Sequence, residues 1–210
     1  MVAGLLFISA LVGIAAARLE IVRKLGPALC SDVPCPHFIT RVSAIESIIG
    51  QQSGGRLYLA IGDSLTEFAE LPPLCGRKPI NAGIGWATSE TFEALGAKFA
   101  ALSKPDFIIV ALGTNDATRK KVGFRAQISK LIASLNGYPL LLIPIPGGPG
   151  VASAAEYNNA LTGLAPMART AGPLQNTGDG IHLAPSAYSA WISSIVDGAD
   201  RHICSKLPAI

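Results

Sequence analysis

A serine, an aspartate and a histidine in this chain have the types and the spacing that nucleophilic catalysis requires. Ser64 lies in the segment Gly62-Asp63-Ser64-Leu65, which directly follows the apolar run 57–61, typical of a buried parallel strand. Far downstream, Asp179 and His182 lie three positions apart. A serine hydroxyl is a poor nucleophile until a base removes its proton, and an imidazole oriented by a carboxylate is such a base. We therefore expect Ser64 to be the nucleophile, His182 the base and Asp179 the orienting acid.

Two further blocks lie between these residues in a fixed order. The segment Asn81-Ala82-Gly83-Ile84-Gly85 follows a second short apolar run, and Gly113-Thr114-Asn115-Asp116 follows a third. Together with Gly62-Asp63-Ser64-Leu65 and Asp179-Gly180-Ile181-His182, they make residues 56–200 resemble the SGNH hydrolases, also called the GDSL esterase/lipase family. The resemblance implies an esterase with no metal and no redox cofactor. The family includes lipases, thioesterases, carbohydrate deacetylases and some acyltransferases.

Acyl transfer also needs hydrogen-bond donors for the oxyanion that develops on the substrate. The backbone N–H of Ser64 and the side-chain amide of Asn115 are the first two candidates. The family usually has a glycine donor where this chain has Trp86, and a positive φ would be strained for tryptophan. The backbone donor is therefore either Trp86 or Gly85. The Trp86 ring would form a wall of the substrate pocket or belong to the core.

Apolar runs and helical periodicities alternate along the chain and predict an α/β fold. Strands are expected over 57–61, 79–81, 107–112 and 140–145, with a weaker fifth near 172–174. Helices are expected over 37–49, 89–102, 120–135, 154–169 and 185–203. This alternation predicts a three-layer α/β/α sandwich around a mainly parallel, flavodoxin-like sheet of about five strands. The carboxyl ends of parallel strands share one edge, so Ser64, the Gly83 loop and Asn115 should converge there.

The N-terminal part of the chain predicts a separate segment. Residues 1–24 are interpreted as an apolar signal or anchor, 25–55 as a lead-in with a helix, and 56–210 as the hydrolase domain. Val2–Ala17 is uncharged, somewhat shorter than the ~20 residues of a membrane helix, and ends in three alanines that suit a signal-peptidase site. Positive charges follow this run instead of preceding it, which would favour a cytoplasmic body. An apolar helix packed on the domain is a further alternative.

The cysteines favour export to the periplasm or beyond, with the N-terminal segment either cleaved or kept as an anchor. The chain has an even number of them, Cys30, Cys35, Cys75 and Cys204, compatible with two disulfides. Three pairings exist. Cys30 and Cys35 are close in sequence, and the parallel topology places Cys75 and Cys204 at the sheet edge opposite the catalytic one, so we expect Cys30–Cys35 and Cys75–Cys204.

Composition limits the partners. The chain of 210 residues is 50% hydrophobic and 15% charged with a net charge of +3, which gives no reason to expect nucleic acid. The cysteines and the three histidines lack zinc-ligand spacing, so no metal is expected. The expected partner is a small-molecule or glycan ester, with possible membrane association through the N-terminal segment; the sequence indicates no oligomeric state.

The expected function is a serine esterase that works through an acyl-enzyme, acting on small acyl groups or on carbohydrate O-acetyl esters. Two alternatives are an O-acyltransferase that acts on a glycan and an inactive carbohydrate-binding protein of the same fold. The nucleophile segment lacks the Gly-x-Ser-x-Gly pattern of α/β-hydrolases, because position 66 is threonine. Gly83-Ile84-Gly85 likewise lacks the third glycine of a dinucleotide-binding loop.

Overall fold

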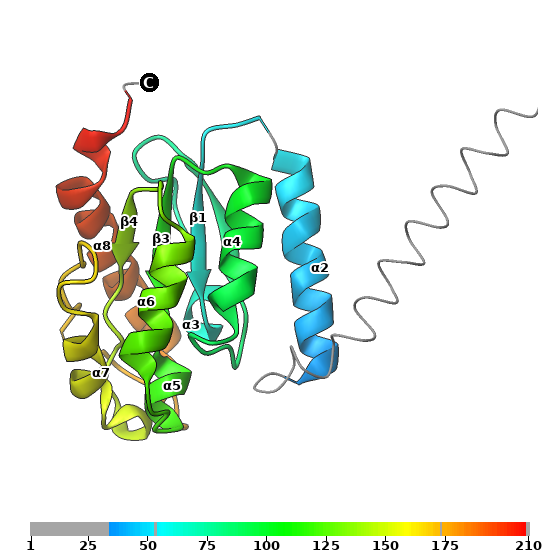
Figure 1. Ribbon diagram of the computed structural model, residues 1–210. Helices are drawn as coiled ribbons and strands as arrows, with labels where there is room; N and C mark the ends of the chain where they lie inside the picture. Colours follow the sequence, from blue (N-terminus) through cyan, green and yellow to red (C-terminus); the bar gives the residue numbers. More distant parts are fainter. Residues whose placement is uncertain (1–33, 53, 173, 209–210) are drawn as a thin grey trace, which may run out of the picture.

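The computed structural model describes residues 34–52, 54–172 and 174–208, which form a parallel sheet flanked by helices (Figure 1). The strands are β1 (Leu57–Gly62), β2 (Lys78–Gly83), β3 (Phe107–Ala111) and β4 (Leu140–Leu142). The helices are α2 (Cys35–Gln52), α3 (Ser64–Glu67), α4 (Phe92–Ser103), α5 (Thr114–Thr118), α6 (Phe124–Ser134), α7 (Ala154–Leu161) and α8 (Pro185–His202), with short 3₁₀ turns η1 (Pro149–Val151) and η2 (Cys204–Lys206).

The sheet has the strand order β2-β1-β3-β4, and all of its pairings are parallel. This order is the flavodoxin-like one that the sequence predicts. Gly62 pairs with both Gly83 and Ala111, so β1, β2 and β3 end at the same level. The strand order reverses between β1 and β3, and the crevice beyond such a point is where α/β sheets bind ligands.

The three predicted layers are present. Alternate strand side chains such as Leu59 and Ile61 pack under α2, α4, α6 and α7, and those between them, such as Tyr58 and Ala60, pack under α8 (Figure 1). Both faces of the sheet are therefore largely buried, which is why β1, β3 and β4 have almost continuous apolar runs, while β2 at the sheet edge does not.

The predicted fifth strand near 172–174 is not formed by its described residues. A single parallel bridge joins Met167 to Leu142 instead, because the Leu142 N–H donates to the Pro166 carbonyl and Ala168 N–H donates back to Leu142. β4 also ends at Leu142, earlier than predicted. Pro144 and Pro146 follow and lack the N–H groups that a longer ladder would need.

Three helices are shorter than their periodicity predicts, and glycine or turn geometry at one end explains each of them. α6 begins at Phe124 because Gly123 has φ 78°, and α7 ends at Leu161, shortly before Gly163 with φ 79° and a proline at 166. α4 begins at Phe92, after a turn in which the Thr91 hydroxyl accepts the Thr88 N–H. α8 has the predicted bounds to within one residue.

The helix predicted over 37–49 is present as α2, which buries Phe38, Ile45 and Ile49 against the core. The apolar run Val2–Ala17 and Cys30 lie outside the described residues. No helix within 34–208, positions 53 and 173 apart, combines the length and the apolar composition that a membrane span needs.

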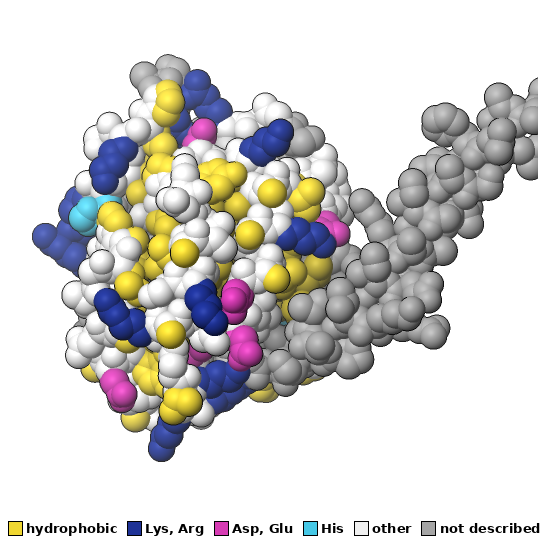
Figure 2. Space-filling model, in the orientation of Figure 1, with side chains coloured by type: hydrophobic (Ala, Val, Ile, Leu, Met, Phe, Trp, Pro, Cys, Tyr) yellow, Lys and Arg dark blue, Asp and Glu magenta, His cyan; other side chains and the backbone are white. Residues whose placement is uncertain are grey.

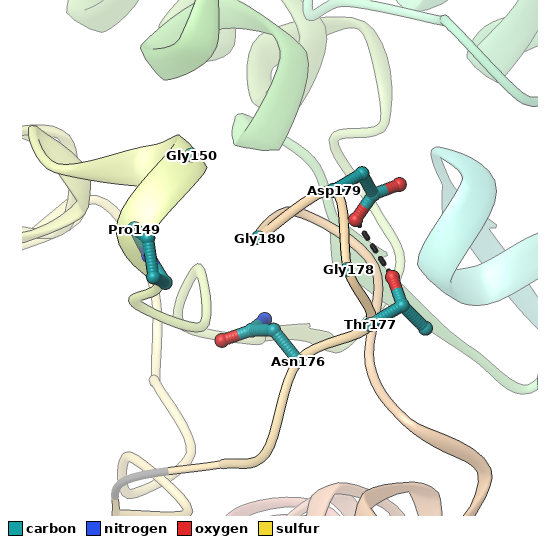
Figure 3. A pocket seen from close by; sticks show the side chains of 7 residues that line it. All are labelled: Pro149, Gly150, Asn176, Thr177, Gly178, Asp179 and Gly180. Carbon is teal, nitrogen blue, oxygen red and sulfur yellow. Dashed lines mark hydrogen bonds between the residues drawn. The ribbon is translucent and has the colours of Figure 1, made fainter.

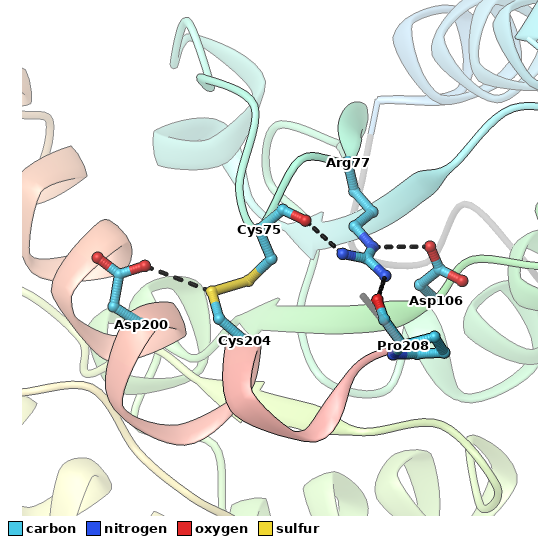
Figure 4. Close-up of a disulfide and its surroundings, with 6 residues drawn as sticks. All are labelled: Cys75, Arg77, Asp106, Asp200, Cys204 and Pro208. Carbon is cyan, nitrogen blue, oxygen red and sulfur yellow. Dashed lines mark hydrogen bonds and ion pairs between the residues drawn. A yellow bond between two sulfur atoms is a disulfide. The ribbon is translucent and has the colours of Figure 1, made fainter. Parts of the chain in front are cut away.

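The predicted Cys75–Cys204 disulfide is present (Figure 4). Cys75 lies just before β2 begins and Ser64 just after β1 ends, so in this parallel sheet they are at opposite edges. The disulfide joins the turn before β2 to the first residue of η2, which follows α8, across 129 positions of sequence. Beside it, the buried Arg77 donates to Asp106 at 2.9 Å, to the Pro208 carbonyl at 2.9 Å and to the Cys75 carbonyl. The pairing Cys30–Cys35 stays a prediction.

The face seen in Figure 2 carries Lys and Arg side chains that lie apart from one another, with apolar side chains between them. On this face the positive charge is therefore spread, not gathered into one patch.

Candidate active site

Ser64 is the first residue of α3, directly beyond the end of β1. Asp63 caps this helix by accepting the Leu65 N–H at 3.0 Å, and Ser64 is 8% exposed. The turn requires glycine before it, because a Cβ atom at Gly62 would lie 1.9 Å from the Thr66 hydroxyl oxygen. Helix geometry leaves the N–H of Ser64 without an intrahelical partner, so it can donate to an oxyanion.

The structure brings Ser64, His182 and Asp179 into one hydrogen-bonded chain. His182 Nε2 lies 2.9 Å from Ser64 Oγ, and His182 Nδ1 lies 2.5 Å from Asp179 Oδ2. The histidine lies just before Pro185 opens α8, which stiffens the loop on its C-terminal side. With Nδ1–H held by the carboxylate, Nε2 is left free to accept the serine proton.

The Asp179 carboxylate is held in its ionised form. Its hydrogen bond to His182 is the main reason that its pKa lies well below the usual range of a carboxyl. The backbone N–H of Ile181 donates to Oδ1 at 2.9 Å and the Thr177 hydroxyl donates at 2.7 Å (Figure 3). The acid therefore stays charged at any pH at which the histidine could act as a base.

The loop that carries Asp179 rests on the glycine-rich turn η1. Gly150 N–H donates to the Gly180 carbonyl at 3.0 Å. A Cβ atom at Gly150 would lie 2.6 Å from Ile181 Cγ1 and 3.0 Å from the Asp179 carbonyl oxygen. The turn and the loop together border an open hollow of about 470 Å³ (Figure 3). The sequence alone indicates no role for this turn, whose glycines allow the close approach.

Asn115 is the second residue of α5, which follows β3, and it lies at the same edge of the sheet as Ser64. Its side-chain amide donates to the Ala87 carbonyl at 3.0 Å, which uses one of its two hydrogens and leaves the other for an oxyanion. The next residue, Asp116, is buried and accepts the Ser89 hydroxyl at 2.7 Å. Burial raises the pKa of Asp116, and the bonds from Ser89 oppose that rise. These contacts tie the Asn115 segment to the loop after β2.

The geometry of the loop after β2 distinguishes between Gly85 and Trp86, the two candidates for the backbone N–H donor to the oxyanion. Trp86 has φ 68°, so the tryptophan does adopt the strained conformation that the sequence analysis used as an argument for Gly85. The Gly85 N–H already donates to Glu67 Oε2 at 2.5 Å. Trp86 is 57% exposed, so the interpretation of its ring as core is wrong. Of the two N–H groups, that of Trp86 is therefore the better candidate.

Glu67 is a residue of this site that the sequence analysis missed. Besides Gly85, its carboxylate contacts His37 Nε2 at 3.1 Å and Arg41 Nε at 3.7 Å, both on α2. Arg41 also donates to the Gly83 carbonyl at 2.7 Å. The only sequence signal was position: Glu67 lies one helical turn after Ser64, on the same short helix. Nothing in the sequence connects α2 to this loop.

The structure also explains two polar residues that support the site. Asn81 donates its side-chain amide to the Thr66 carbonyl at 2.7 Å and accepts the Gly83 N–H at 3.0 Å, which fastens β2 to α3. Asp63 is 1% exposed, and this burial raises its pKa to about 6. Its side chain caps α3 by accepting the Leu65 N–H.

No group of three or more His, Cys, Asp or Glu side chains in the described part of the chain is arranged to hold a metal ion.

No protein-family model matches this chain, and no curated protein matches its sequence. Solved structures do. A lipase/acylhydrolase from Enterococcus faecalis is 19% identical with a TM-score of 0.60, covering 74% of this chain and 98% of its own. An acetyl xylan esterase from Geobacillus stearothermophilus is 15% identical with a TM-score of 0.56, covering 70% and 94%. A GDSL-like lipase from Bacteroides thetaiotaomicron is 14% identical with a TM-score of 0.59, covering 76% and 97%.

Each of these structures matches this chain over almost its whole length, so the similarity extends to the complete fold of the matched protein. At these identities they establish architecture, while the chemistry has to be argued from this chain's own residues. This chain therefore has the α/β fold of these lipase and esterase structures, which is the fold that its resemblance to the SGNH hydrolases implies.

Proposed function

We propose that this protein is a serine esterase that hydrolyses a carboxylic ester through an acyl-enzyme. The observation that carries the proposal is the continuous chain from Asp179 through His182 to Ser64, with contacts of 2.5 Å and 2.9 Å. Ser64 Oγ attacks the ester carbonyl while its proton passes to His182 Nε2. The carbonyl oxygen takes the negative charge, and the imidazolium that forms is stabilised by the ionised Asp179.

The two half-reactions follow from these positions. Collapse of the first tetrahedral intermediate breaks the bond to the alcohol oxygen, which takes the proton from His182 Nε2 and leaves. A water molecule then gives a proton to the same nitrogen and attacks the acyl carbon, and Ser64 is released with its proton restored. The N–H groups of Ser64 and Trp86 and the second amide hydrogen of Asn115 are the proposed donors to the oxyanion in both steps.

The proposed acyl group is small, and carbohydrate O-acetyl esters are one substrate class within the proposal. The His182 and Asp179 side chains are 33% and 46% exposed, which supports an open site without a long enclosed acyl tunnel. One structural neighbour is named as an acetyl xylan esterase. A series of p-nitrophenyl esters of rising acyl length, followed by acetylated sugars, tests this part of the proposal.

Covalent labelling tests the nucleophile. A fluorophosphonate probe should label the wild-type protein at Ser64, and Ser64→Ala should lose both labelling and ester hydrolysis while keeping the fold. Ser193→Ala, at an exposed position on α8, is the matched control and should behave as wild type. Labelling at another serine, or turnover retained in Ser64→Ala, would overturn the mechanism.

We also propose that the protein is exported, either released or anchored by its N-terminal segment. The Cys75–Cys204 disulfide supports this, because disulfides persist mainly in oxidising compartments. Non-reducing peptide mapping of protein isolated from the periplasm tests it. Free thiols at Cys75 and Cys204 in that material would remove the argument.

A further inference from the structure

An open groove of about 720 Å³ lies beside His182, between α3 and the start of α8. Six of its lining residues matter here: Phe68, Glu70, His182, Leu183, Tyr188 and Ile192. We call it the α3–α8 groove. Its size is within the range of about 300–1,000 Å³ that small-molecule sites usually have.

The walls of this groove are held in place by regular structure. Phe68 caps the C-terminus of α3, one helical turn after Ser64, so the two side chains share a face of that helix. Its ring lies 5.7 Å from the His182 ring, centre to centre, at a tilt of 43°. On the opposite side, Tyr188 and Ile192 lie one turn apart on α8, and Tyr188 is fixed by an edge-on contact with Trp191 at 6.1 Å.

The position of the groove defines which part of an ester it can receive. The alcohol oxygen must take its proton from His182 Nε2, so the leaving group has to lie on the imidazole side of Ser64. The α3–α8 groove is lined by His182 and by none of the proposed oxyanion donors. It is therefore next to the alcohol part of the substrate.

The groove's chemistry is mainly apolar. Phe68 is 64% exposed, which is unusual for a large apolar side chain and leaves its ring free to cover a ligand. A hydroxyl-rich alcohol would lose water against Phe68, Leu183 and Ile192, which offer no hydrogen-bonding side-chain group. The hydroxyl-bearing side chains of the groove are those of Thr177, Tyr188 and Ser189. Glu70 is the one acidic side chain among the six and is exposed, so it would repel an alcohol that carries a negative charge.

From these observations we infer that the enzyme selects esters whose alcohol is an apolar group, aromatic or branched aliphatic and without negative charge, and binds that group in the α3–α8 groove. This inference rests on the proposed serine esterase function and, within it, disfavours carbohydrate O-acetyl esters, whose alcohol is rich in hydroxyl groups. It assigns Phe68 and Ile192 as specificity-determining residues for the leaving group and Glu70 as the residue that excludes anions.

A test holds the acyl group constant and varies the alcohol. Ethyl acetate, 3-phenylpropyl acetate and 3-acetoxypropane-1-sulfonate share an acetyl group and differ in apolar area and charge. We expect kcat/KM for the phenylpropyl ester to exceed that for the ethyl ester by about 10-fold or more, as filling an apolar pocket allows. Phe68→Ala and Ile192→Ala should each reduce this ratio. Glu70→Gln should raise kcat/KM for the sulfonate relative to the phenylpropyl ester.

Leu102→Ala is the control, since it removes another exposed apolar side chain from α4 in the opposite layer and should leave the ratio unchanged. The inference alone would be overturned if the ratio of kcat/KM for the phenylpropyl ester to that for the ethyl ester were equal in wild type, both groove variants and this control, while turnover still depended on Ser64. Absence of Ser64-dependent turnover for every ester would overturn the esterase proposal instead. Thermal melts establish that each variant is folded, and the two groove variants, on different helices, give independent readouts.

Discussion

The Glu67 carboxylate accepts the backbone N–H of Gly85 at 2.5 Å, and this bond fixes the turn that presents Trp86 beside the nucleophile. The close approach is visible in the packing: a Cβ atom at Gly85 would lie 3.2 Å from Glu67 Oε2 and 3.8 Å from Ser64 Cβ. Through His37 and Arg41, the same carboxylate joins α2 to the oxyanion side of the site. Glu67 is therefore a positioning residue in the proposed mechanism.

Glu67→Ala should lower kcat by up to about 10²-fold, because a shift of about 1 Å in the position of the Trp86 N–H donor can reduce the rate by that factor. KM should change less, since the oxyanion forms only after attack. Glu67→Gln retains an oxygen that can accept the Gly85 N–H and should recover much of the rate. Steady-state kinetics of the two variants checks this. A loss that appears only in KM, or no rescue by glutamine, would contradict the positioning role.

Asp179→Asn should reduce kcat by about 10⁴-fold, the loss seen when the same change is made in a serine protease triad. The amide presents the wrong hydrogen-bond pattern to His182 Nδ1, which favours the tautomer whose Nε2 carries the proton. The protein should still fold, because the Asp179 side chain is 46% exposed and no large group is removed. Single-turnover kinetics with an activated ester measures the effect, and an unchanged rate would remove Asp179 from its role.

Asn115→Ala should lower kcat by about 10²–10³-fold, the range for one lost side-chain donor to an oxyanion. KM should move little. A matched variant, Asn158→Ala, removes an amide that bonds the backbone of Ile145 and does not face Ser64 in the proposed mechanism. It should affect stability more than the chemical step. A pure KM effect in Asn115→Ala would mean that the amide only holds substrate.

Asp63 should make the protein less stable as pH rises from about 4 to 6. Burial raises the pKa of its carboxyl from 3.8 to about 6, so within this window the folded state binds a proton that the unfolded state has lost. Relative to wild type, the free energy of unfolding of Asp63→Asn should therefore rise by up to about 3 kcal/mol between pH 4 and pH 7. Urea unfolding at several pH values measures it, and a difference independent of pH would refute the assignment.

The Cys75–Cys204 disulfide should stabilise the fold strongly. It closes a loop of 129 positions, and the chain-entropy estimate for such a loop is about 4–5 kcal/mol. The double variant Cys75→Ser, Cys204→Ser should lose that amount of unfolding free energy in urea, while the wild-type protein under reducing conditions should behave as the variant does. Equal stability of oxidised wild type and variant would show that the bond constrains little.

The sequence by itself predicted which candidate catalytic residues lie close together and at which edge of the sheet they meet. Ser64 and Asn115 each follow a buried apolar run, and parallel strands place such positions together whatever the details of packing. The same topology places Cys75 and Cys204 at the opposite edge. These inferences depend only on strand direction, which an apolar run and the following loop define locally.

Only the tertiary structure decided how the oxyanion loop is held. The positive φ of Trp86, the capture of the Gly85 N–H by Glu67 and the contribution of His37 and Arg41 arise where α2, α3 and the loop after β2 meet. Residues on α2 are about thirty positions from Glu67 in sequence, and no local periodicity encodes a contact between two polar side chains at that separation. The free energy of such contacts depends on packing that the whole fold creates, which is why a residue-by-residue analysis of the chain does not reveal them.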